Sequence, residues 1–242
     1  MKILKLIGVV ALFCCICADS LASNSSINAM QTQKKTMILN QLKSKDLIST
    51  EIKKLGDSDK NEVLCLALNI YNEARGSSVQ DQIASSYTVF NRMNDDEYPL
   101  FYPQEKKSIC NVIFDRYQYC WTNPETIKIP QERKAWQDAQ YLAYKLYTQP
   151  IHKELSKMFE IKHYVVQSMV NQSNKPKWIN NRKFTINIGA HSYMLLKNPS
   201  KTKEELRRQY DNAITRGYLA IFNRLPKEKN FKKIILPSII KK

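Results

Sequence analysis

The sequence predicts an α+β domain that is mainly helical and carries a small antiparallel sheet. Residues 63–71 are apolar on almost every face, which is typical of a helix buried inside a domain. Further segments place apolar side chains at helical spacing: residues 79–93, 131–147 and 203–223. Others alternate or form short apolar runs typical of strands: residues 163–169, 184–188 and 192–195. Because the helices come first and the short strands follow, we expect an α+β arrangement.

The helix at residues 63–71 leads into a single carboxylate, Glu73. Asp59 and Glu62, three positions apart, can form a capping box at the start of this helix, and Gly76 can end it in the left-handed conformation. Glu73 then lies in the last turn, nearly in line with the buried face. Burial and the negative end of the helix dipole both disfavour the charged form, so we expect a raised pKa for Glu73. A raised pKa suits a general acid; a glutamate paired with a basic neighbour at a frayed helix end is the alternative.

The second helix has a capping signal of its own. Ser78 and Asp81, three positions apart, precede a face formed by Val79, Ile83 and Tyr87. We therefore expect a helix that begins after Ser78 and runs to about residue 93.

The first 22 residues have the pattern of a secretory signal peptide. A basic start over residues 1–5 precedes an apolar stretch over residues 6–18, which is too short to span a membrane comfortably. Small residues follow at positions 20–22, so we expect cleavage near Ala22 and a periplasmic or secreted location. A retained anchor is the alternative.

The rest of the chain divides into three expected parts. Residues 23–56 are polar and predict a flexible stem, within which residues 37–55 can form a helix. Residues 57–223 carry the periodic apolar pattern and predict the globular catalytic domain. Residues 224–242 form a basic C-terminal tail.

Cysteine usage leaves the disulfide pattern open. Three cysteines lie beyond the signal peptide, and an odd number does not form a disulfide framework. Cys65 sits in the apolar helix, where we expect it to pack as a small hydrophobic residue. Cys110 and Cys120 can pair in an oxidising compartment, or both can stay reduced.

The charge points to an anionic partner. The net charge is +16, which favours binding to a cell wall or a membrane surface outside the cytoplasm. A Lys-rich composition caused by an AT-rich genome would give the same charge without any function. Nucleic-acid motifs are absent and Arg, the usual base reader, is scarce, so we expect no nucleic-acid partner.

Several short pieces of the sequence, in order, resemble the spore cortex-lytic (SleB/CwlJ-type) family of cell wall hydrolases. These pieces are residues 69–76, 89–92, 110–113, 118–122, 135–136, 163–164, 176–178 and 188–193. The resemblance implies cleavage of the peptidoglycan glycan strand, between N-acetylmuramic acid and N-acetylglucosamine, on a fold like goose-type lysozymes and lytic transglycosylases. It also implies that Glu73 takes the position of the catalytic glutamate, and that peptidoglycan is the partner.

The reaction type follows from the number of carboxylates. Hydrolysis usually needs a second carboxylate beside the acid. The other candidates lie outside the matching motifs: Asp81, Asp115, Asp138 and Glu160. In a lytic transglycosylase the muramic acid's own 6-hydroxyl attacks and one glutamate acts as base and then acid, so we favour this reaction. A lysozyme-like hydrolase and a non-catalytic wall-binding protein are the alternatives.

Sugar recognition supplies the remaining candidate residues. Sugars expose apolar CH faces that stack on aromatic rings, and side-chain amides bond to N-acetyl groups. The candidates for the substrate-binding cleft are Gln118, Tyr119, Trp121, Tyr164, Trp178, His191 and Tyr193. Trp136 follows the apolar stripe of its helix and is expected in the core, and Arg92 is expected to donate a structural ion pair.

A zinc amidase is a further alternative. His163 and His191 together with Glu73 would make a two-histidine, one-carboxylate site. However, the sequence has no local metal-ligand spacing. We therefore expect no metal and no cofactor.

Export can be tested on the protein from its native host. We expect the mature chain to begin just after Ala22, because the basic start, the short apolar stretch and the small residues match a cleaved signal. Intact mass measurement of the extracytoplasmic protein checks this. A cytosolic chain that still begins at Met1 would contradict it.

Overall fold

The computed structural model describes residues 24–98, 107–115, 118–123 and 127–224. The expected signal peptide, and the basic tail from residue 225 onward, lie outside these residues. The α-helices are α1 (Asn24–Ser44), α2 (Thr50–Lys53), α3 (Asp57–Asn69), α4 (Val79–Met93), α5 (Ile109–Phe114), α6 (Arg133–Thr148), α7 (Ile151–Phe159) and α8 (Lys203–Phe222). Among the described helices, none is both long and apolar enough to cross a membrane.

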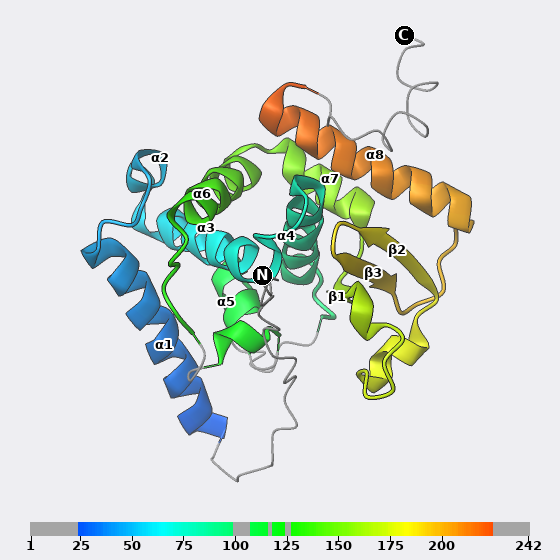
Figure 1. Cartoon of the computed structure of the whole chain (residues 1–242), viewed down its shortest axis with the longest axis horizontal. Coiled ribbons are helices and arrows are strands. Elements are labelled where there is room, and N and C mark those ends of the chain that lie inside the picture. Colours follow the sequence, from blue (N-terminus) through cyan, green and yellow to red (C-terminus); the bar gives the residue numbers. More distant parts are fainter. Residues whose placement is uncertain (1–23, 99–106, 116–117, 124–126, 225–242) are drawn as a thin grey trace, which may run out of the picture.

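Helix α3 forms the centre of the helical part. Its side chains from Val63 to Asn69 are all buried, and α5 and α6 pack against it (Figure 1). Trp136 of α6 is 2% exposed, and its indole nitrogen donates a hydrogen bond to the Leu47 carbonyl at 2.7 Å. The predicted core positions of the apolar helix and of Trp136 are therefore confirmed.

The ends of α3 differ from the sequence prediction. The helix begins at Asp57 with Gly56 as N-cap and without a side-chain cap, so Asp59 and Glu62 do not form a capping box. The helix does not end at Gly76 in a left-handed conformation either. Among the described glycines, Gly189 is the one with a positive φ.

The chain instead widens into a π-helical turn, η1 (Ile70–Ala74), directly after α3. Side chains satisfy the carbonyls that this change of pitch leaves open. Asn72 Nδ2 donates to the Leu68 carbonyl at 2.8 Å, and Arg75 donates to the Tyr71 carbonyl at 3.1 Å. A left-handed glycine is therefore not required to close the helix.

Helix α4 follows the sequence prediction closely. Ser78 is its N-cap, and the Ser78 hydroxyl accepts a hydrogen bond from the Asp81 backbone amide at 3.3 Å. Ile83 and Tyr87 on the predicted face are fully buried. Helix α7, which packs against α4 and α8, was not predicted, because it has only nine residues and follows the polar loop at residue 149.

The segment 23–56 is not a flexible stem throughout. Helices α1 and α2 lie within it, and Ile38, Leu42 and Ile52 are buried in the same core as α3. The sequence analysis did not predict that these three side chains are buried, because the segment as a whole is polar. From about residue 38 onward, the segment packs as part of the globular domain.

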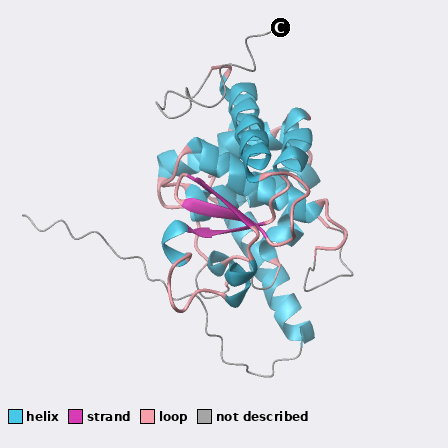
Figure 2. Ribbon diagram, turned by 90° about the vertical axis from the view of Figure 1, so that its right-hand side faces the viewer, coloured by secondary structure: helices cyan, strands magenta, loops and turns pink. Residues whose placement is uncertain are grey.

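Three antiparallel strands form the sheet: β1 (His163–Val166), β2 (Phe184–Ile188) and β3 (His191–Leu195). Their order is β1-β3-β2, so β3 is central, and its first four side chains are buried. Figure 2, which views the molecule from the side of the sheet, shows the strands in front of the helices. Helices thus dominate around a small antiparallel sheet, which confirms the predicted fold class.

The first strand is shorter than predicted. Strand β1 ends at Val166, opposite His191, because the partner strand β3 begins there. Residues Gln167–Met169 continue as a 3₁₀ turn instead of extending the strand to residue 169.

A disulfide joins Cys65 of α3 to Cys110 of α5. The sequence favoured simple packing for Cys65, and this prediction is wrong; it left open whether Cys110 pairs with Cys120 or stays reduced, and neither alternative is the observed one. The helical packing of α5 on α3 brings Cys110 to Cys65, and such long-range contacts are not visible in the spacing of cysteines along the chain.

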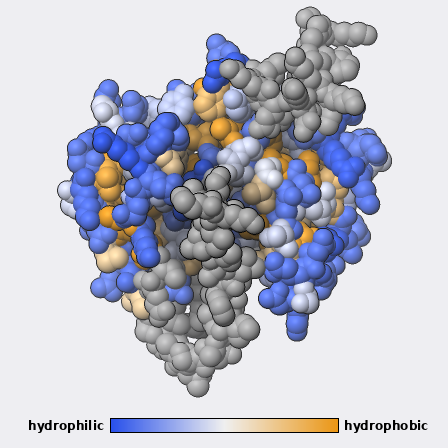
Figure 3. All heavy atoms as spheres, in the orientation of Figure 1, coloured by the Kyte–Doolittle hydropathy of each residue, from blue (hydrophilic) through white to orange (hydrophobic). Residues whose placement is uncertain are grey.

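Hydrophilic side chains are prominent on the face of the molecule shown in Figure 3, where they surround the outline and apolar atoms appear between them. The whole sequence carries a net charge of +16, so the protein is strongly basic.

The disulfide should contribute measurably to stability. The double variant Cys65→Ala/Cys110→Ala should lose about 2–4 kcal/mol of unfolding free energy, because the bond closes a long loop between two core helices. Urea unfolding under non-reducing conditions measures this. The control Cys120→Ala, at an exposed position outside the disulfide, should change stability by less than about 0.5 kcal/mol. Equal stability of the double variant and the wild type would contradict the assigned role.

Candidate active site

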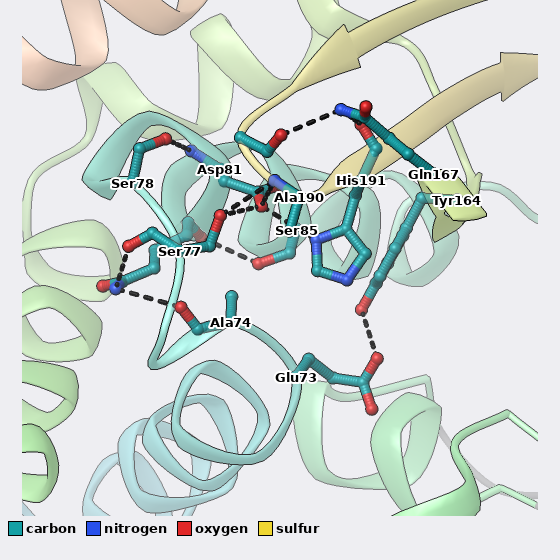
Figure 4. Close-up of polar contacts among 12 residues, drawn as sticks. Glu73, Ala74, Ser77, Ser78, Asp81, Ser85, Tyr164, Gln167, Ala190 and His191 are labelled. Carbon is teal, nitrogen blue, oxygen red and sulfur yellow. Dashed lines mark hydrogen bonds and ion pairs between the residues drawn. The ribbon is translucent and has the colours of Figure 1, made fainter. Parts of the chain in front are cut away.

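Glu73 lies on the π-helical turn η1, where the central helix α3 meets the sheet. Figure 4 shows its carboxyl group directed toward Tyr164 of β1. The Tyr164 hydroxyl donates a hydrogen bond to Glu73 Oε2 at 3.3 Å. As a residue, Glu73 is partly buried. π-Helical turns of this kind are frequent at functional sites.

The surroundings of Glu73 raise its pKa above the ordinary value for a glutamate. Burial disfavours the charged carboxylate and is the largest effect. His191, the Tyr164 hydroxyl and Arg92 act in the opposite direction, but burial outweighs them. The direction agrees with the sequence prediction, although the helix dipole invoked there is not among the causes.

Tyr164 stays protonated beside Glu73. Burial raises the pKa of the Tyr164 hydroxyl well above its ordinary value, and the nearby charge of Glu73 adds to this effect. The hydroxyl therefore acts as a hydrogen-bond donor to the carboxyl group at any pH at which the protein works.

Arg92, at the end of α4, supplies a positive charge that acts on both Glu73 and Tyr164. It donates from Nε to the Lys162 carbonyl at 2.8 Å and from Nη1 to the Tyr119 hydroxyl at 2.9 Å. Its guanidinium group also lies over the rings of Tyr98, Tyr119 and Tyr164, at 5.5, 5.4 and 6.0 Å from their centroids. The sequence analysis predicted that Arg92 would donate an ion pair. In the structure, Arg92 instead contacts a backbone carbonyl, a tyrosine hydroxyl and three aromatic rings.

A buried carboxyl group, Asp81, organises the other side of the site. Its oxygens accept hydrogen bonds from the Ala190 amide at 2.9 Å, the Tyr193 hydroxyl at 2.5 Å and the Ser77 hydroxyl (Figure 4). His191 Nδ1 lies 2.9 Å from the same carboxyl group. An ionised carboxylate only accepts hydrogen bonds, and Asp81 accepts them from both sides. Asp81 therefore joins the start of α4 to the turn between β2 and β3.

The turn approaches Asp81 so closely that it requires Gly189. This residue has a φ of 56°, and a Cβ at its position would lie 2.6 Å from Asp81 Cβ and would also strike the Ser77 hydroxyl. Gln167 supports the turn from β1, because its amide donates to the Gly189 carbonyl at 2.8 Å.

The structure brings several predicted binding residues together. Tyr164 and His191 stand beside Glu73, with their rings edge to face at 5.1 Å. Tyr119 is linked to this group through Arg92, which donates a hydrogen bond to its hydroxyl. The ring centroids of Tyr119 and Trp121 are 6.4 Å apart, and the two rings are tilted relative to each other.

Other predicted binding residues connect to Tyr98, whose ring lies beneath the guanidinium group of Arg92. Gln118 accepts a hydrogen bond from the Tyr98 hydroxyl at 2.9 Å. Trp178 is half-buried and packs on His163, which in turn contacts the Tyr98 ring.

Tyr193 departs from its predicted role. Its side chain is completely buried, its ring packs on Phe159 at 5.5 Å, and its hydroxyl is engaged by Asp81. Side chains alternate along a strand, but β3 is central and covered on both faces, so Tyr193 supports the site from within the core.

The strand register contradicts the zinc alternative. His163 pairs with Met194, whereas His191 pairs with Val166 at the other end of the β1–β3 ladder. Three ladder steps separate the two imidazoles, which corresponds to roughly 10 Å along the strands. They are too far apart to bind one ion with Glu73.

A comparison with protein families identifies the domain. The family described as Cell Wall Hydrolase matches residues 76–194. The domain belongs to the cell wall hydrolase family. No curated protein and no solved structure matches the chain.

The family match covers most of the site described above. It includes Asp81, Arg92, Tyr164 and His191, and it begins just after Glu73. The family therefore shows a hydrolase that acts on the cell wall, while the role of Glu73 rests on the geometry and the sequence motif. The lysozyme-like fold stays a prediction.

Sequence reasoning missed the roles of Asp81 and Arg92 in this cell wall hydrolase domain. Asp81 was interpreted as part of the capping signal that begins at Ser78. The Ser78 hydroxyl does the capping and engages only the backbone amide of Asp81, so the Asp81 side chain is available for a different role. Tyr98, which contacts Gln118 and Arg92, was not among the candidate residues. Each of these roles depends on a contact between residues far apart in the chain.

The glycine requirement at the β2–β3 turn can be tested directly. Gly189→Ala should cost at least about 1–3 kcal/mol of unfolding free energy, because the residue has a positive φ and its Cβ would strike Ser77 and Asp81. The matched control is Gly76→Ala, where no atom lies within 4 Å of the added Cβ, and the change should stay within about 1 kcal/mol. Thermal unfolding of both variants measures the difference. Similar stabilities would refute the steric argument.

Proposed function

We propose that this protein is an exported enzyme that cleaves the glycan strand of peptidoglycan, with Glu73 as the general acid. The observation that carries the proposal is the placement of Glu73: a carboxyl group with a raised pKa, held by Tyr164, at the border of helix and sheet. Such a group can stay protonated near neutral pH and give its proton to a leaving oxygen.

The site's other groups support this chemistry. Protonated Glu73 donates its proton to the glycosidic oxygen as the bond to the sugar breaks. The anionic Glu73 that results is stabilised by the Tyr164 hydroxyl and by the charge of Arg92. The hydrogen bond from Tyr164 also orients the carboxyl group, which lowers the cost of reaching the reactive geometry.

We infer a lytic transglycosylase reaction, because the other candidate carboxylates have different tasks. Asp81 is completely buried and fully engaged by its donors. Asp138 forms an ion pair with Lys134 on α6, and Glu160 accepts a hydrogen bond from Tyr210 at 3.0 Å. A reaction with one acid and an internal 6-hydroxyl nucleophile suits this arrangement. A lysozyme-like hydrolase remains the second candidate, because Asp115 is also buried close to Gln118.

Export is supported by the disulfide. Disulfides such as Cys65–Cys110 form and persist mainly in oxidising compartments, for example the periplasm or the exterior of the cell. The basic surface would then meet anionic wall polymers, and Gln118, Trp121 and Trp178 are available for contacts with sugar rings and N-acetyl groups.

Product analysis tests the proposal. Digestion of purified peptidoglycan by the mature protein, followed by mass spectrometry, should give 1,6-anhydromuramyl ends. New reducing ends would instead indicate the hydrolase. Soluble stem peptides would indicate an amidase, and retention on sacculi without any soluble product would indicate a binding protein.

Glu73→Gln should reduce turnover by at least about 10²-fold, because the amide has no proton to donate. Glycan release measured by chromatography checks this. The matched control is Glu132→Gln, an exposed carboxylate that pairs with Arg75, and it should keep wild-type turnover. Near wild-type release by Glu73→Gln would overturn the assignment.

The free energy of unfolding of the Glu73→Gln variant, measured by urea unfolding at several pH values, shows whether the variant folds like the wild type. A raised pKa means that the folded protein binds the proton more tightly than the unfolded chain, so the buried charge destabilises the fold as pH rises above the unfolded value. The variant should therefore be at least as stable as the wild type at pH 7, and this advantage should shrink as the pH is lowered.

A further inference from the structure

His191 has a ring nitrogen that the single-carboxylate reaction does not use. Its Nδ1 lies 2.9 Å from Asp81 Oδ2. Because a carboxylate only accepts hydrogen bonds, Nδ1 carries the proton, and the neutral ring keeps a lone pair on Nε2. Among the described residues, no side chain or backbone group bonds to Nε2.

The ring is held firmly in one orientation. His191 is only 3% exposed, and strand β3 fixes its backbone between Val166 of β1 and Ile188 of β2. The Tyr164 ring packs edge-on against the imidazole at 5.1 Å. Figure 4 shows the free edge of the ring turned toward Glu73 and the Tyr164 hydroxyl.

We propose that His191 is a second catalytic residue, whose Nε2 takes the proton of the attacking hydroxyl while Glu73 protonates the leaving oxygen. This role rests on the proposed function. Asp81 is a positioning residue: it selects the tautomer that leaves Nε2 basic, and it stabilises the imidazolium that forms.

The step balances with these two groups alone. The bond between the anomeric carbon and the glycosidic oxygen breaks, and the glycosidic oxygen takes the proton from Glu73. The 6-hydroxyl oxygen forms the new bond to the same carbon and loses its proton to His191 Nε2. The site is left with an anionic Glu73 and a cationic His191, and one proton transfer through solvent restores both.

Charged and titratable groups face His191 from every element around it. Asp81 of α4 and Glu73 of η1 are the acidic groups, and Tyr164 of β1 and Tyr193 of β3 contribute neutral hydroxyls. Arg92 is the cation that acts on Glu73.

Two catalytic groups should give a bell-shaped dependence of kcat on pH. His191 must be neutral, which sets the acid limb, and Glu73 must be protonated, which sets the basic limb.

The test is the pH profile of glycan release by the mature protein and three variants. His191→Gln should lower kcat by about 10²–10⁴-fold, leave KM for soluble glycan fragments unchanged, and lose the acid limb. The matched control is His163→Gln, which lies at the other end of the β1–β3 ladder and should keep the acid limb.

Tyr193→Phe provides a milder variant that keeps the ring in the core. It removes one hydrogen bond from Asp81, which makes that carboxylate a stronger partner for the imidazolium. The acid limb should then move to higher pH, while the basic limb stays in place. This variant keeps the test decisive if His191→Gln fails to fold.

Three results would overturn the role of His191. They are a wild-type profile without an acid limb, a His191→Gln variant that changes only KM, and an acid limb that does not move in Tyr193→Phe. Failure of the proposed function looks different, since the wild type would then release no glycan product, or Glu73→Gln would stay active. An inactive Glu73→Gln beside a fully active His191→Gln would overturn the role of His191 alone.

Discussion

The site depends on one buried carboxylate. Asp81 accepts hydrogen bonds from the start of its own helix, from the turn between β2 and β3 and from the core tyrosine Tyr193. A buried charge is tolerated only when it is paired or fully hydrogen-bonded, so each of these donors is needed for the carboxylate to remain buried. The helical part and the sheet are therefore locked together at the place where His191 and Tyr164 come to Glu73.

The hydrogen bonds of Asp81 join two parts of the site, one on the helical part of the domain and one on the sheet. Glu73 sits on a turn of the helical part, where its pKa is raised by burial. His191 sits on the central strand, where packing leaves one ring edge open. The two side chains are 118 positions apart in the chain, and the hydrogen bonds of Asp81 help to fix their relative position. Precise placement of catalytic groups on rigid elements is what lowers the cost of reaching a reactive geometry.

Local patterns in the sequence predicted much of this fold. The apolar run before Glu73, the Ser78 cap and the strand alternation around Tyr164 are all short-range signals, and each of these elements is present. Glu73, Tyr164 and His191 were candidates because they lie in runs that resemble a family, and the structure brings the three side chains together. What the sequence could not supply were contacts across the fold: the partner of Cys65, the core position of Ile38 and the second task of Asp81. These depend on which elements pack together, and no local spacing encodes that.

The π-helical turn makes the position of Glu73 depend on the length of the chain as well as on its side chains. A turn of this kind holds one residue more than the α-helical turn it replaces. Deleting a single residue between Asn69 and Glu73 would let α3 continue as a regular helix, and the chain after the turn would keep nearly its present direction. The wider turn that carries Glu73 would then be lost, although every packing side chain of α3 would still be present. A frame-preserving loss of one codon would thus change the backbone under the carboxyl group while the core stays intact.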